Sequence, residues 1–123
     1  MMDRYIDVIQ RSFELLQTME EGLEYMHSRI QEGEYEASIV MMQDVSVAYS
    51  VLGRSLFPVL EKLLPNKIEE LGNKFQQALI RLLAAYEQRT WGDVEATLSH
   101  VLMPCYRTWK VELEKQLQPY ILL

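Results

Sequence analysis

The sequence predicts an all-α fold, an antiparallel four-helix bundle built from two tandem helical hairpins. Apolar residues recur at helical spacing through four long segments. Five glycines and four prolines in 123 residues leave few places for β-turns. Residues 33–39 (GEYEASI) also recur 59 residues later as residues 92–98 (GDVEATL), each time after one helical pattern and at the start of another. We therefore expect a duplicated helical hairpin, and the bundle is the simplest way for two long hairpins to close.

The first hairpin is expected over residues 3–64. Its first helix runs to about residue 31, and its apolar stripe has intervals of three and four: Ile6, Ile9, Phe13, Leu16, Met19, Leu23, Met26 and Ile30. The second helix begins after Gly33 and reaches at least Leu56. Pro58 predicts either a kink or a short new helix ending near Leu64, before the break at residues 65–66.

The second hairpin is expected over residues 66–118, followed by an apolar tail at residues 119–123. Its first helix spans residues 67–89. Its second helix starts near residue 93, and Pro104 predicts a kink at residues 101–103. The inward stripe of this last helix is expected to comprise Val94, Leu98, Val101, Cys105, Trp109, Leu113 and Leu117. The whole chain, residues 1–123, is expected to form one domain.

The second helix is more apolar than the wall of a four-helix bundle requires. Between residues 39 and 52 its only charged residue is Asp44. Besides the inward stripe, a second set of apolar residues predicts a partner interface: Val40, Met41, Val47, Ala48 and Val51. A homodimer is the first expectation, because symmetric dimers are the commonest assemblies. The apolar tail and another protein are the alternatives.

The charge and the cysteine content limit which partners and which cellular compartment we expect. The net charge is −6, and all of this imbalance falls in residues 1–36. A surface of this sign repels phosphate, so we expect no nucleic-acid partner and no membrane partner. A solvated helix face is the plain interpretation of these acids, and a docking face for a basic partner is the other. Cys105 is the single cysteine, which favours the cytoplasm, and no signal peptide or membrane-spanning run is apparent.

One possible metal motif occurs on the first helix. Glu24 and His27 form a Glu-x-x-His pair, of which a bundle di-metal site needs two. The repeat places Tyr86 opposite His27, and Thr97 stands where His100 would need its acid. We therefore predict no metal and no cofactor. A metal or small-ligand site around Glu24, His27 and His100 is kept as the alternative function.

No catalytic residue is predicted either. Cys105 lies on the expected inward stripe beside Pro104, which indicates a buried thiol. His100 is five residues away, so the two side chains point in different directions on a helix, and no third polar residue would orient the base. The glycines are isolated, so no phosphate-binding loop is present. The prediction is a non-enzymatic bundle that acts through protein–protein contacts as a homodimer, an adaptor or a chaperone-like protein.

Three partial resemblances accompany this prediction. Residues 33–38 (GEYEAS) resemble the turn between the paired helices of tetratricopeptide repeats, but the period of 59 differs from the 34 of that family. The acidic first helix, the paired hairpins and the stretch 98–113, with Pro104 and Trp109, resemble small all-helical proteins of Gram-positive bacteria. This resemblance implies a bacterial cytoplasmic protein. The format is also similar to that of flagellar export chaperones.

Overall fold

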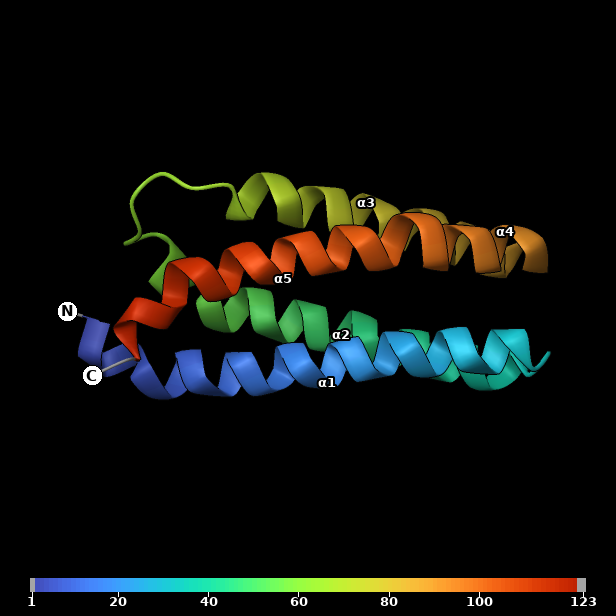
Figure 1. Cartoon of the computed structure of the whole chain (residues 1–123), viewed down its shortest axis with the longest axis horizontal. Helices are drawn as coiled ribbons and strands as arrows, with labels where there is room; N and C mark the ends of the chain where they lie inside the picture. Colours follow the sequence, from blue (N-terminus) through green and yellow to red (C-terminus); the bar gives the residue numbers. More distant parts are fainter. Residues whose placement is uncertain (1, 122–123) are drawn as a thin grey trace.

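The computed structural model describes residues 2–121 and confirms the all-α bundle of two hairpins (Figure 1). A 3₁₀ turn over Met2–Tyr5 leads into α1 (Ile6–Gln31), which is followed by α2 (Tyr35–Leu60) and α3 (Ile68–Glu87). The fourth long helix of the bundle is made of α4 (Trp91–Thr97), a π-helical turn (Leu98–Leu102) and α5 (Met103–Leu117). A 3₁₀ turn over Gln118–Tyr120 follows it. The last two residues of the predicted tail, 122–123, lie outside the described residues.

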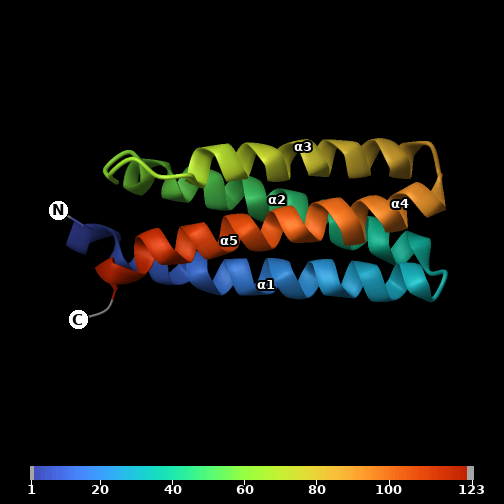
Figure 2. The ribbon, with the colours of Figure 1, turned by 45° about the horizontal axis from the view of Figure 1, so that its top comes forward.

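Figures 1 and 2 show the two hairpins packed lengthwise against each other. α1 lies against α2, α3 lies against α4 and α5, and α5 also contacts α1. Both ends of the described chain lie at the end of the bundle where the α2–α3 loop is found (Figure 2). Leu16, Leu23, Phe75, Leu82 and Tyr106 are fully buried along the shared core. Leu16 and Leu23 belong to the apolar stripe predicted for the first helix, of which Ile9, Met19, Met26 and Ile30 are also buried.

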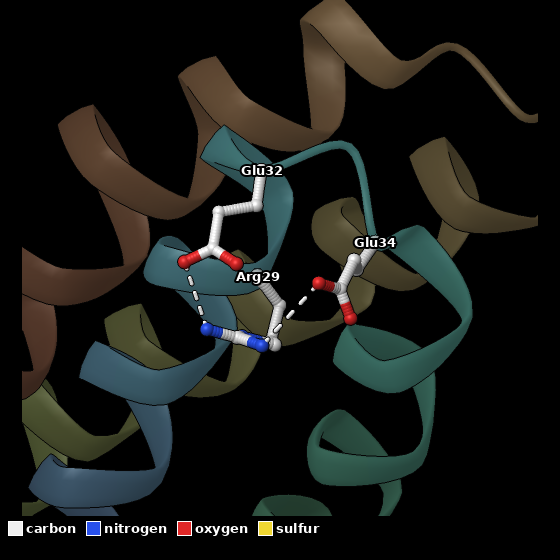
Figure 3. A network of polar contacts seen from close by, with 3 residues as sticks. All are labelled: Arg29, Glu32 and Glu34. Atoms are coloured by element: carbon white, nitrogen blue, oxygen red, sulfur yellow. Dashed lines mark hydrogen bonds and ion pairs between the residues drawn. The ribbon is translucent and has the colours of Figure 1, made fainter.

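The α1–α2 turn is fixed by a backbone cap and a charged side chain. Gly33 has a φ of 77°, and the N–H of Glu34 donates to the carbonyl of Arg29 at 2.8 Å, which is the hydrogen bond of a Schellman cap. The Arg29 guanidinium pairs with Glu32 at 2.8 Å and with Glu34 at 3.4 Å (Figure 3). The same side chain lies over the ring of Tyr25.

The α3–α4 turn has the same cap, but not at the residue that the sequence repeat indicates. Arg89 has a φ of 56°, and the N–H of Thr90 donates to the carbonyl of Ala85 at 3.2 Å. The structural counterpart of Gly33 is therefore Arg89, and Gly92 lies inside α4. The expected correspondence at 59 residues is wrong by three. Tyr86 consequently matches Ile30 and not His27.

Pro58 and Pro104, the two prolines within helices, affect their helices differently. α2 continues through Pro58 to Leu60, so of the two alternatives stated for Pro58 the short new helix reaching Leu64 is wrong. Before Pro104, by contrast, the helix widens into the π turn, and the N–H of Met103 donates to the carbonyl of Leu98, five residues back. Pro104 lacks an N–H and its ring crowds the preceding turn, which is the physical reason for a defect at this place.

The π turn changes which residues face the core. A wider turn aligns residues four apart, so Leu98, Leu102 and Tyr106 are all fully buried. Val101 and Cys105, predicted on the inward stripe, are only half-buried. The prediction for these two positions is therefore wrong by one residue, whereas Trp109, at 5% exposure, lies in the core as expected.

Candidate functional site

Three valines form an exposed row on the outer side of α2. Val40, Val47 and Val51 are 59%, 63% and 39% exposed, and their spacing of seven and four places them on one helix face. We call this row the valine face. Asp44 and Arg54 are exposed on the same helix and are the charged residues nearest to the row in sequence.

The other two predicted interface residues are turned toward the core. Met41 and Ala48 are half-buried and pack against the hydrophobic core. A Cβ at Gly22 of α1 would lie 3.1 Å from the Met41 sulfur, so Met41 fills the space that this glycine leaves between α1 and α2. The structure thus divides the predicted set of five into three exposed valines and two contributors to intramolecular packing.

A second apolar feature lies between the C-terminal half of α2 and the N-terminal half of α3. It is a groove of about 840 Å³ that extends under the 61–67 loop. We call it the α2–α3 groove. Its apolar lining comes from three helices and the loop: Leu52, Leu56, Phe57, Leu60, Leu63, Leu64, Ile68, Trp109 and Leu113. Phe57 and Leu64 are 61% and 83% exposed at this groove, so apolar surface is open to solvent here.

Two glycines shape the groove in different ways. Gly53 on α2 and Gly72 on α3 both line it. No atom lies within 4 Å of a Cβ built on Gly53, whereas a Cβ on Gly72 would lie 3.1 Å from the indole Nε1 of Trp109. Gly72 therefore allows the indole to approach the backbone of α3, and Gly53 leaves part of the groove unfilled.

Aromatic side chains cluster beside the groove. Trp109 stacks on Phe75, with ring centroids 5.6 Å apart, and meets Tyr49 edge-on at 5.4 Å. The Tyr49 hydroxyl donates to the carbonyl of Gly72 at 3.2 Å, and burial raises the pKa of Tyr49. Among the described residues no protein hydrogen bond reaches Nε1–H of Trp109, and this nitrogen keeps contact with solvent although the side chain is only 5% exposed. The indole N–H is thus a groove donor that can bind water or a ligand.

The electrostatics of the groove and the nearby core are set by few charges. Arg54, Glu61 and Glu69 are exposed residues of the groove lining. Deeper in the core, the hydroxyl of Tyr106 donates to the Leu16 carbonyl. Burial first, and then the negative charges of Glu20 and Glu114, raise the pKa of Tyr106 well above its ordinary value. This tyrosine stays protonated and holds α5 against α1.

The residues of the alternative metal hypothesis do not form a cluster. Glu24 and His100 are exposed, and His27 is half-buried. Among the described residues, no group of three or more His, Cys, Asp or Glu side chains is placed to hold a metal ion. Cys105 is a free thiol on α5 and is half-buried instead of fully buried. The geometry gives these residues no common site.

A polar network joins the two hairpins at the end of the bundle that holds the α1–α2 and α3–α4 turns. The sequence did not reveal this network. Tyr86 donates to the Ser38 hydroxyl at 2.7 Å, and Ser38 donates to the Tyr35 carbonyl at 2.6 Å. The Tyr35 ring stacks on Trp91 at 4.4 Å, so Trp91 joins the two turns of the bundle. Burial raises the pKa of Tyr86, and its hydrogen bond with Ser38 opposes this shift.

These features define a class of protein, a small antiparallel helical bundle with an exposed apolar face on its second helix and an apolar groove between its second and third helices. A family model described as a domain of unknown function, DUF8042, matches residues 7–112, and the chain belongs to this family. No curated protein and no solved structure matches the chain. Within residues 2–121, no helix is long and apolar enough to cross a membrane.

Proposed function

We propose that the protein is a non-enzymatic interaction module and that its valine face pairs with a second copy of the chain. The observation that carries this proposal is the exposed row of Val40, Val47 and Val51 along one helix. Apolar rows at such spacing are used by helices that pack against another helix. Removing three valine side chains from water in each copy contributes on the order of 1 kcal/mol per side chain.

The charges on α2 support a second copy as the partner. In an antiparallel pair whose two-fold axis passes near residue 49, Val47 lies level with the partner's Val51. The same arrangement brings Asp44 level with the partner's Arg54, so opposite charges border the seam. A two-fold contact needs one self-complementary surface, which this row provides. A helix of another protein is the alternative occupant, in the manner of an adaptor or an export chaperone.

The expected setting of this module is the cytoplasm of a bacterium. The single cysteine fits a reducing compartment, and the similarity to small helical proteins of Gram-positive bacteria supports the same assignment. The net charge of −6 opposes binding to nucleic acid or to anionic lipid. A protein partner is therefore favoured over both.

The oligomeric state in solution tests the proposal directly. Light scattering coupled to size exclusion, over a series of concentrations, is expected to show a mass that rises toward twice 14.5 kDa. Val47→Glu is expected to abolish this rise because it places a charge in the seam. Val111→Glu is the matched control, since Val111 on α5 is also 63% exposed but lies on another helix. A wild type that stays monomeric, or equal effects of the two substitutions, would refute self-pairing through α2.

A further inference from the structure

We infer that the α2–α3 groove is a binding site for a neutral, mostly apolar small molecule that carries a ring system and a hydrogen-bond acceptor. The groove adjoins the valine face, because Arg54 lines the groove and also borders the proposed seam, but ligand binding in it does not require a second copy. Its volume of about 840 Å³ is within the range of small-molecule sites, which are largely apolar with a few placed polar groups. Sites of this kind occur between the helices of bundles.

The need for an acceptor follows from the polar groups of the groove. Trp109 is a donor only, and its Nε1 lies 3.1 Å from the position of a Cβ built on Gly72, with no hydrogen bond to a described residue. A ligand that offers an acceptor there replaces the water that can reach this N–H, and the hydrogen bond fixes the orientation of the ligand. The hydroxyl of Tyr49 already donates to the backbone of Gly72.

The neutral and aromatic character of the ligand follows from charge and shape. Glu61 and Glu69 outnumber Arg54 in the lining, within a chain of net charge −6, so an anionic ligand such as a fatty-acid carboxylate is disfavoured. Tyr49, Phe57 and Trp109 contribute aromatic rings to the lining, and such rings favour stacking or edge contacts with another ring. Binding would also cover the exposed ring of Phe57.

The probe for this site is Prodan, a neutral naphthyl ketone whose emission reports both the polarity around it and hydrogen bonding to its carbonyl. Protein is titrated into a low fixed concentration of Prodan. Saturable binding is expected with a Kd on the order of 10–100 μM, given the usual yield of affinity per ligand atom. Laurate, a fatty-acid carboxylate, serves as the anionic competitor and is expected to displace Prodan poorly.

Two substitutions connect binding to the groove. Gly53→Leu is expected to weaken binding by at least about tenfold, because its side chain occupies groove space, while it maintains or raises Tm since leucine is a better helix former than glycine. Gly92→Leu is the matched control, because Gly92 also has no atom within 4 Å of a built Cβ but does not line the groove. Trp109→Phe, checked for folding by circular dichroism, is expected to weaken binding about fivefold and to shift the emission to the blue.

Definite outcomes would overturn the inference. They are the absence of saturable Prodan binding, equal binding by Gly53→Leu and the wild type, or laurate competing as well as a neutral ketone. Saturable Prodan binding would also be absent if the groove bound a helix of another protein. Val47→Glu is expected to leave Prodan binding unchanged, which separates this site from the proposed dimer.

Discussion

Alanine substitutions at the two groove glycines are expected to have opposite effects on stability. Gly53 and Gly72 both lie within helices, so replacing either with alanine removes the same backbone-entropy penalty. The two sites differ in what the added methyl group meets. At Gly53 it meets nothing within 4 Å, and at Gly72 it meets the indole of Trp109 at 3.1 Å.

The magnitudes follow from these two contacts. Gly53→Ala gains the difference in helix propensity, about 1 kcal/mol, with no steric cost. Gly72→Ala gains the same amount but must displace an indole that is packed against Phe75, Tyr49 and Tyr106. Overpacking a well-filled core typically costs about 1–3 kcal/mol, so the net change is a loss of up to about 2 kcal/mol. The two variants are therefore expected to differ by about 1–3 kcal/mol.

Urea unfolding followed by circular dichroism at 222 nm measures this difference, with thermal unfolding as a second measurement. A gain of about 1 kcal/mol corresponds to a rise in Tm of about 4 °C for a domain of this size. Gly92→Ala is an added reference because the built Cβ there also meets no atom within 4 Å. If Gly72→Ala proved as stable as Gly53→Ala, the indole would not be held as firmly as its contacts indicate, and the reasoning would be refuted.

Three further predictions concern the turns and the buried tyrosines. Arg89→Gly is expected to stabilise the fold and Gly33→Ala to destabilise it, each by about 1 kcal/mol in urea unfolding, because both positions have positive φ. If both substitutions changed the free energy of unfolding in the same direction, the two turns would not share one type of cap. Ser38→Ala is expected to cost about 1–3 kcal/mol by the same measurement, since it leaves the Tyr86 hydroxyl unpaired, whereas Tyr86→Phe costs about 1 kcal/mol. A smaller cost for Ser38→Ala than for Tyr86→Phe would refute this account. Because burial raises the pKa of Tyr106 in the folded state, its contribution to stability is complete below pH 10 and is lost as the pH rises above 10, by up to about 1.4 kcal/mol per pH unit. Urea unfolding between pH 8 and 11 is expected to show a shallower decline for Tyr106→Phe, and identical slopes would contradict the raised pKa.

The core of the first three helices could be predicted because it depends on local periodicity. Leu16, Met42 and Phe75 are buried because an amphipathic helix has only one face that can leave water, and the spacing of apolar residues identifies this face. The exposed valines of α2 could be predicted for the same reason, as apolar residues in excess of one face. The periodicity of one chain encodes no partner for them.

The groove could not be predicted, because it depends on how far two helices lie apart. Gly53 and Gly72 are isolated glycines in the sequence, and nothing local shows that both face the same space. The position of the Trp109 indole against Gly72 likewise depends on residues of two different helices. The only sequence signal was a glycine within each of two helical patterns, next to apolar residues, which is unusual enough to indicate close approach or open space.

The repeat at 59 residues shows how a helical pattern can mislead. Shifting an amphipathic stripe by three or four residues superposes it on itself, so Leu16 and Phe75 match at an offset of 59 and are both buried. The cap geometry is not periodic, and it fixes the offset at 56, where Gly33 corresponds to Arg89. At this offset a left-handed residue follows each first helix, and the second helix begins two residues later, with Tyr35 and Trp91. These two rings stack on each other, so the true correspondence is also a physical contact between the hairpins. A backbone cap is therefore better evidence for a repeat than the agreement of apolar positions.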